Sequence, residues 1–171
     1  MITLVIPALN ECDSIAATVT RAAHVFEQAG LAPAEIIVVD DGSNDGTGAL
    51  AQEAGARVIT HPHNVGYGRS LKDGIAAAVH DTIVISDADG TYPLEDIPRL
   101  VEAYHKGFDM VVGARTGAHY HESLLKSPLR AILRRIVEFT TSRKIPDINS
   151  GLRVFSRKTV MSYFHHLCDT F

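Results

Sequence analysis

Two aspartates that follow a hydrophobic run are the residues of this chain best suited to chemistry. Residues 82–86 are β-branched or small, and Asp87-Ala88-Asp89-Gly90 follows them directly. An apolar run of this length that ends in a turn predicts a buried strand. The two carboxylates would then lie at the carboxyl edge of a sheet, where open α/β sheets bind their ligands.

Two carboxylates this close repel each other unless a cation or a shared proton intervenes. A divalent ion, Mg²⁺ or Mn²⁺, held by Asp87 and Asp89 is the predicted cofactor, because such an ion takes one or two carboxylates together with substrate phosphates. For an isolated Asp-x-Asp sequence a hydrated acidic turn would be the simpler interpretation. The other motifs of the chain favour the metal.

Composition limits the class of protein. The chain has 171 residues, of which 46% are hydrophobic and 21% charged, and this predicts one globular domain with a substantial core. A net charge of −4 argues against general nucleic-acid binding. Cys12 and Cys168 show neither metal spacing nor a disulfide pattern, which is typical of a cytoplasmic protein. No apolar stretch reaches the roughly 20 residues that span a bilayer.

Strand and helix patterns alternate along the chain. Hydrophobic spacing and turn residues predict a mainly parallel central sheet in a three-layer α/β/α arrangement. The expected strands are residues 2–7, 35–39, 57–60, 82–86 and 108–113, and the expected helices are 14–28, a short helix that ends near 54, 66–79 and 94–104.

Polar motifs follow the ends of these strands. The sequence from Pro7 to Glu11 lacks the glycine fingerprint of a dinucleotide-binding turn, so a Rossmann oxidoreductase is disfavoured. In Asp40-Asp41-Gly42-Ser43, a carboxylate can accept hydrogen bonds from a ribose or a base edge, although an Asx turn is the simpler alternative. Gly66 and Gly68 would allow a ligand to approach the backbone closely.

These motifs together resemble those of glycosyltransferase family 2, especially its dolichyl- and polyprenyl-phosphate sugar transferases, of which dolichol-phosphate mannosyltransferase is an example. The resemblance covers nearly the whole chain. It is carried, in this order, by Val5-Ile6-Pro7-Ala8-Leu9-Asn10-Glu11, Val39-Asp40-Asp41-Gly42-Ser43, Asn64-Val65-Gly66-Tyr67-Gly68, Asp87-Ala88-Asp89-Gly90, Val112-Gly113-Ala114-Arg115 and Asp147-Ile148-Asn149-Ser150-Gly151-Leu152-Arg153.

The resemblance implies a GT-A fold, a GDP- or UDP-hexose donor, a divalent metal and inversion at the anomeric carbon. Residues 1–115 would bind the nucleotide sugar, and residues 116–171 would form an acceptor-side segment that could be truncated at its C-terminus. Metal binding falls to Asp87 and Asp89, and catalytic roles to Asp89, Arg115, Asp147 and Arg153. The implied nucleotide-sugar site is Pro7, Asn10, Glu11, Val39, Asp40, Gly42, Ser43, Gly66, Gly68, Asp87, Ala88 and Asp89.

The expected acceptor is a polyprenyl or dolichyl phosphate. A phosphate monoester, with a second pKa of about 6, is largely ionised at neutral pH and needs little help from a base, whereas a sugar hydroxyl would need one. Residues 123–146 carry six basic side chains and one acid among leucines and isoleucines at helical spacing. Such a pattern fits a helix on an anionic membrane or an ordinary surface helix equally well, and the family resemblance favours peripheral contact at the cytoplasmic membrane face.

Two alternatives remain open. Asp87-Ala88-Asp89-Gly90-Thr91 also resembles the signature of haloacid-dehalogenase phosphatases, in which Asp87 would be the nucleophile, although the chain lacks their later acidic pair. A truncated nucleotide-sugar-binding module without transfer activity is the other alternative. The histidine pairs His61/His63 and His119/His121 are expected to be solvated loop residues, because neither pair has a third ligand nearby.

Overall fold

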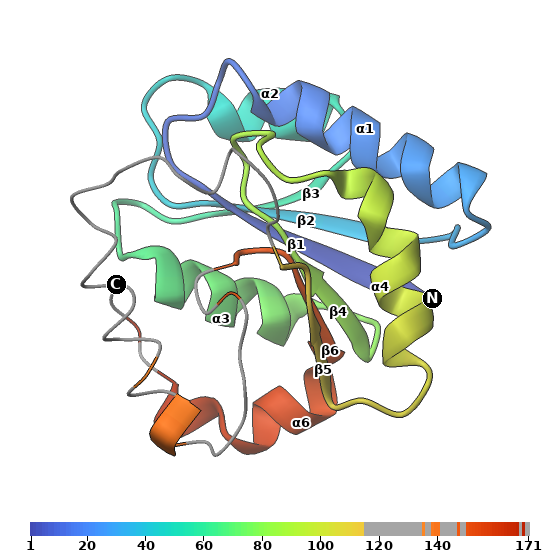
Figure 1. Ribbon diagram of the computed structural model, residues 1–171. Helices are drawn as coiled ribbons and strands as arrows, with labels where there is room; N and C mark the ends of the chain where they lie inside the picture. The colour runs from blue at the N-terminus through green and yellow to red at the C-terminus, as the bar shows by residue number, and fades with distance from the viewer. Residues whose placement is uncertain (115–134, 136–137, 141–146, 148–149, 168, 170–171) are drawn as a thin grey trace.

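A central sheet lies between two layers of helices (Figure 1). The structure is a computed structural model that describes residues 1–114, 135, 138–140, 147, 150–167 and 169. Within this part of the chain the sheet has six strands in the order β3-β2-β1-β4-β6-β5. They are β1 (Ile2–Ala8), β2 (Glu35–Asp40), β3 (Arg57–Thr60), β4 (Thr82–Ile85), β5 (Met110–Val112) and β6 (Arg153–Ser156).

Four strands run parallel, so their carboxyl ends share one edge of the sheet. β1 pairs with β2 and β4, and β2 pairs with β3, all in parallel. Every residue of β1 is buried, as expected for a central strand that is covered on both faces. The loops that follow β1, β2 and β4 therefore meet at this edge, where ligand sites of α/β sheets form.

β6 breaks the parallel pattern. It lies between β4 and β5 and is antiparallel to both. In this register Arg153, the first residue of β6, pairs with Ile85, the last residue of β4. The antiparallel direction thus brings the start of β6 to the same edge as the carboxyl ends of the parallel strands.

The helices cover the two faces unequally. One face packs against α1 (Ile15–Gln28), α2 (Thr47–Glu53), the 3₁₀ turn η1 (Leu94–Asp96) and α4 (Ile97–Tyr104), and the other packs against α3 (Tyr67–Ala77) and α6 (Arg157–Ser162). Each face encloses its own hydrophobic core. The predicted three-layer α/β fold with a mainly parallel sheet is confirmed.

α3 approaches the sheet closely because Gly74 has no side chain. A Cβ at this position would lie 2.4 Å from Val5 Cγ1 and 3.0 Å from Val39 Cγ2. The first turn of the same helix points towards the carboxyl edge of the sheet. Close packing at Gly74 therefore determines how near the first turn of α3 lies to that edge.

Several predicted boundaries differ from the structure. The strand expected at residues 108–113 is only Met110–Val112, and the helix expected at 94–104 begins as the 3₁₀ turn η1. Neither β6 nor α6 was predicted as an element. In the part of the chain that the structure describes, none of the helices combines the length and the hydropathy needed to cross a bilayer.

Candidate active site

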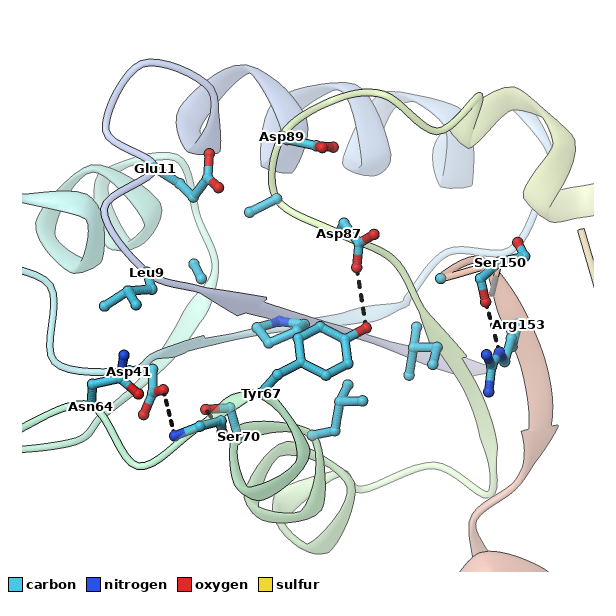
Figure 2. A pocket seen from close by; sticks show the side chains of 17 residues that line it. Leu9, Glu11, Asp41, Asn64, Tyr67, Ser70, Asp87, Asp89, Ser150 and Arg153 are labelled. Atoms are coloured by element: carbon cyan, nitrogen blue, oxygen red, sulfur yellow. Dashed lines mark hydrogen bonds between the residues drawn. The ribbon is translucent and has the colours of Figure 1, made fainter. Parts of the chain in front are cut away.

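A cavity of about 780 Å³ opens at the carboxyl edge of the sheet (Figure 2). Its walls come from the loops after β1, β2, β3 and β4, from the first turn of α3, and from the segment that begins β6. The described residues that line it are Pro7, Ala8, Leu9, Glu11, Asp41, Asn64, Gly66, Tyr67, Ser70, Leu71, Ile85, Asp87, Ala88, Asp89, Ser150, Gly151 and Arg153.

The structure brings part of the predicted site together at this cavity. The predicted residues that line it are Pro7, Glu11, Gly66, Asp87, Ala88, Asp89 and Arg153, and the predicted residues outside its lining are Asn10, Val39, Asp40, Gly42, Ser43, Gly68 and Asp147. Arg115 lies outside the described residues, as do His119, His121 and nearly all of residues 123–146.

Asp87 is held from two sides of the cavity. The phenol of Tyr67, on α3, donates a hydrogen bond to Asp87 Oδ1 at 3.1 Å. On the other side, a Cβ at Gly151 would lie only 2.6 Å from Asp87 Oδ2, so the carboxylate occupies the space that a side chain there would fill. The first carboxylate of the Asp-x-Asp sequence therefore has a fixed place between α3 and the segment leading into β6.

The Tyr67 phenol is a neutral donor in this arrangement. Burial raises the pKa of Tyr67 above its ordinary value, and the negative charge of Asp87 raises this pKa further. The neighbouring charge of Arg153 acts in the opposite direction but is outweighed. Tyr67 therefore keeps its proton near neutral pH and donates a hydrogen bond to the Asp87 carboxylate.

Asp89 closes an exposed turn beside Asp87. Its Oδ1 accepts hydrogen bonds from the Thr91 backbone at 2.9 Å and from the Thr91 hydroxyl at 2.8 Å. No group of three or more histidine, cysteine or acidic side chains in the described residues is arranged to hold a metal ion. Two carboxylates on the wall of one cavity still fit Mg²⁺ or Mn²⁺, because these ions take further oxygen ligands from substrate phosphates and water.

The adjacent residues Asp40 and Asp41 point to opposite faces of the sheet. Asp41 faces the cavity, whereas Asp40 lies on the side of α2, where a Cβ at Gly48 would come within 2.4 Å of Asp40 Oδ2. Asp40 Oδ1 accepts a hydrogen bond from the Ser43 backbone at 2.9 Å. This alternation follows from the period of two along a strand. The cavity is therefore faced by Asp41 and not by Asp40, which was the predicted site residue.

Asp41 organises the loop in front of α3. Its carboxylate accepts hydrogen bonds from the backbone N–H groups of Val65 and Gly66, each at 2.9 Å, and lies 2.8 Å from His61 Nδ1. Burial acts to raise the pKa of Asp41, but the hydrogen bonds from Val65, His61 and Gly66 outweigh it, so the pKa lies below its ordinary value. Asp41 is therefore ionised in the folded protein at neutral pH.

His61 differs from the expectation for a solvated loop histidine. Its side chain is only 10% exposed and bridges two carboxylates, because Nδ1 faces Asp41 and Nε2 lies 3.2 Å from Asp73 Oδ2. His63, in contrast, is exposed. The burial of His61 follows from its backbone, whose N–H donates to the Asp40 carbonyl at 2.9 Å and continues the edge of the sheet.

Several residues predicted to bind the nucleotide sugar join the loops to one another in the structure. The Asn10 backbone donates to Ser43 Oγ at 3.0 Å, and the Asn10 side chain accepts from the Asn44 backbone at 3.2 Å. Gly42 has φ +79°, and a Cβ there would meet the His63 backbone at 2.6 Å. Through these contacts the loop after β2 is fixed against the loops after β1 and β3.

The last predicted site residues lie at and before the start of β6. Arg153 lines the cavity, and its Nε donates to the Ser150 carbonyl at 2.8 Å, which orients the guanidinium. Asp147 is buried and lies outside the cavity lining. Ser150 and Gly151 also line the cavity but are not among the predicted site residues, although both belong to the motif that ends at Arg153.

With this geometry in view, similarity to known proteins identifies the family. The family described as Glycosyl transferase family 2 matches residues 3–164. This chain therefore belongs to glycosyltransferase family 2, which confirms the resemblance found in the sequence.

The relatives include transferases that act on a lipid phosphate. Over 177 aligned residues the chain is 32% identical to an undecaprenyl-phosphate 4-deoxy-4-formamido-L-arabinose transferase of Pectobacterium carotovorum subsp. carotovorum. The match covers 99% of this chain and 53% of the relative. A transferase of the same name from Salmonella paratyphi B is 32% identical over 165 residues, with coverage of 93% and 50%. The chain thus spans about half the length of the curated relatives it matches.

Solved structures of similar fold contain a metal and a nucleotide. Glucosyl-3-phosphoglycerate synthase from Mycobacterium tuberculosis, in complex with Mn²⁺, UDP and glucosyl-3-phosphoglycerate, has a TM-score of 0.73 and 29% identity, covering 95% of this chain and 58% of that one. The same synthase with Mn²⁺, UDP-glucose and phosphoglyceric acid has a TM-score of 0.72 and 30% identity, with coverage of 95% and 58%.

Proposed function

We propose that this chain is an inverting glycosyltransferase that moves a hexose, mannose or glucose, from a GDP- or UDP-sugar to a polyprenyl phosphate. The observation that carries the proposal is the cavity at the carboxyl edge of the sheet, which gathers Asp41, Asp87, Asp89 and Arg153 in a member of this family. Acidic groups for a cation and a cationic group for phosphate face the same space. This combination suits a nucleoside diphosphate bound together with a metal ion.

The diphosphate end of the donor would lie at Asp87, Asp89 and Arg153. The two carboxylates would hold Mg²⁺ or Mn²⁺, and the bound ion would stabilise the negative charge that develops on the departing diphosphate. The Arg153 guanidinium, oriented by the Ser150 carbonyl, would donate hydrogen bonds to phosphate oxygens. By motif matching, Arg115 would add a second guanidinium, and the role of Asp147 stays a prediction.

The nucleoside end would lie at Asp41 and Asn64. Figure 2 shows these two side chains at the opposite side of the cavity from Ser150 and Arg153, with the Tyr67 ring between the two groups. An ionised carboxylate accepts hydrogen bonds from ribose hydroxyls or from N–H groups of a base. We therefore assign to Asp41 the role predicted for Asp40, with Pro7 and Glu11 on the neighbouring wall.

The proposed acceptor is a lipid phosphate. The names of the relatives specify undecaprenyl phosphate as acceptor for those proteins. An ionised phosphate monoester is itself a nucleophile, so the site would need to position it and would need little base catalysis. The basic segment at residues 123–146 would hold the protein at the cytoplasmic membrane face, close to such an acceptor.

Titration calorimetry with UDP and GDP, with and without Mn²⁺, tests the donor site. We expect one of the two nucleotides to bind at least tenfold more tightly with Mn²⁺, and Asp87→Asn or Asp89→Asn to remove this gain. Asp109→Asn, at an exposed aspartate outside the cavity, is the matched control and should keep it. Metal-independent binding that survives both cavity variants would contradict the proposed role of the aspartates.

Transfer to undecaprenyl phosphate separates the remaining alternatives. Donor binding without any transfer of radiolabelled sugar would favour a binding module that lacks transfer activity. Trapping of Asp87 by beryllium fluoride would instead favour a phosphatase. The family match weighs against a phosphatase. The position of Asp87 does so too, because this residue follows β4 and not the first strand of the chain.

A further inference from the structure

We propose that Tyr67 is a positioning residue that sets the affinity of the site for its divalent cation by fixing the Asp87 carboxylate. The inference rests on the proposed function, because it assumes that Asp87 holds a cation there. It assigns a role to a side chain that the predicted site did not include.

The position of the Tyr67 ring is fixed by the start of α3. Tyr67 is the first residue of this helix, and Gly66 before it donates its backbone N–H to Asp41 at 2.9 Å. The Gly66 carbonyl accepts from the Ser70 backbone at 3.0 Å and closes the first turn. The ring therefore projects into the cavity from a backbone that is tied to the end of β2, and its hydroxyl reaches Asp87 Oδ1 (Figure 2).

The opposite side of Asp87 is confined by the segment that leads into β6. The Gly151 backbone N–H donates to the hydroxyl of Tyr92 at 2.6 Å, and Tyr92 itself is buried. Both Asp87 oxygens lie close to where a Gly151 Cβ would be, at 2.9 Å for Oδ1 and 2.6 Å for Oδ2. The carboxylate is thus confined between a fixed backbone on one side and the Tyr67 phenol on the other.

Hydrogen bonds to ligating carboxylates orient them and tune the metal. Removal of such an outer partner typically weakens metal binding by about 10–100-fold. Tyr67 fits this role better than a role in folding, because its residue is 39% exposed and belongs to neither hydrophobic core. Loss of the hydroxyl alone should therefore change cation affinity while the fold stays intact.

Manganese binding to Tyr67→Phe is the test. Free Mn²⁺ is followed by electron paramagnetic resonance while the ion is titrated into the whole chain with saturating UDP or GDP. We expect about 10–100-fold weaker Mn²⁺ binding in Tyr67→Phe, with nucleotide binding in the absence of metal unchanged. Tyr163→Phe is the matched control, because this exposed tyrosine lies outside the cavity and should keep the wild-type affinity.

A second variant probes the same carboxylate from the other side. A Cβ introduced by Gly151→Ala would displace the Asp87 carboxylate, so Mn²⁺ affinity should fall in this variant too. Wild-type Mn²⁺ affinity in Tyr67→Phe, in an experiment where Asp87→Asn abolishes binding, would overturn the role of Tyr67 and leave the proposed function standing. Mn²⁺ binding that Asp87→Asn does not change would overturn the metal site itself.

Discussion

Asp41 supports the structure of the loop before α3 as well as the wall of the cavity. Its buried carboxylate satisfies two backbone N–H groups and faces His61. A neutral amide in its place would weaken all three interactions. We expect Asp41→Asn to lower the free energy of unfolding at pH 7 by about 1–3 kcal/mol, the value of a buried hydrogen bond to a charged group.

The same carboxylate makes stability depend on acid. Because folding lowers the pKa of Asp41, its contribution is complete above the ordinary aspartate pKa of about 4 and is lost as the pH falls through the lower folded value. The difference in stability between wild type and Asp41→Asn should therefore shrink below about pH 4. Urea unfolding across this range measures it. A difference that stays constant, or one that Asp109→Asn reproduces, would contradict this role.

At the residue scale the sequence locates the acidic clusters but does not show which side chains face the cavity. Asp40 and Asp41 have the same side chain. They are distinguished only by the face of the sheet to which each points at the end of β2. Val38 packs on the face of α1, and Val39 on the face of α3. Knowledge of which helix covers which face would have pointed to Asp41, but that information belongs to the tertiary structure. Tyr67 likewise belongs to a motif that the sequence shows. Its contact with Asp87, however, joins α3 to the loop after β4 and is known only from the tertiary structure.

At the scale of elements, the packing of α3 on β1 and β2 depends on Gly74. A methyl group added there would overlap Val5 and crowd Val39. We expect Gly74→Ala to destabilise the protein by about 1–3 kcal/mol, as overpacking in a well-packed core does, although alanine favours a helix. Thermal unfolding tests this, with Ala76→Ser on the exposed side of α3 as control. Equal or greater stability of Gly74→Ala would show that α3 can shift away from the sheet.

The parallel strands and the helices between them follow from patterns that the sequence carries locally. Apolar runs that end in polar residues mark β1, β2 and β4, and helical spacing marks α1 and α3. β6 has no such signature, because it contains only two apolar residues and its first residue belongs to a polar motif. Its place between β4 and β5 is decided by pairing across the sheet, which no local pattern specifies.

At the scale of the whole molecule, Lys72 ties the segment around η4 (Phe164–His166) to α3. Its ammonium group donates to the Leu167 carbonyl at 2.6 Å, lies 2.7 Å from Asp169 Oδ1 and sits 5.3 Å from the centre of the Phe164 ring. The backbone carbonyl of Asp169 in turn accepts from the Arg69 N–H at 3.0 Å. This segment thereby caps the helix that carries Tyr67 into the cavity.

Removal of this ammonium group should loosen the contact. In Lys72→Met we expect the Arg69 amide to exchange its hydrogen on the order of tenfold faster, because Asp169 would no longer be held against it. Hydrogen exchange measured by NMR reports this amide directly. Lys106→Met, which removes an exposed lysine paired with Glu102, should leave that rate unchanged. An unchanged rate in Lys72→Met would mean that the segment is held by other contacts.

The antiparallel placement of β6 also affects the order of events during synthesis. Translation delivers Asp41, Tyr67 and Asp87 well before Gly151 and Arg153, yet all five border the same cavity. A ribosome-bound nascent chain that has emerged only as far as β5 would leave the edge of β4 unpaired and its aspartate without its glycine neighbour. The cavity is therefore complete only once β6 has left the exit tunnel, so an unfinished polypeptide lacks the wall that Gly151 and Arg153 supply.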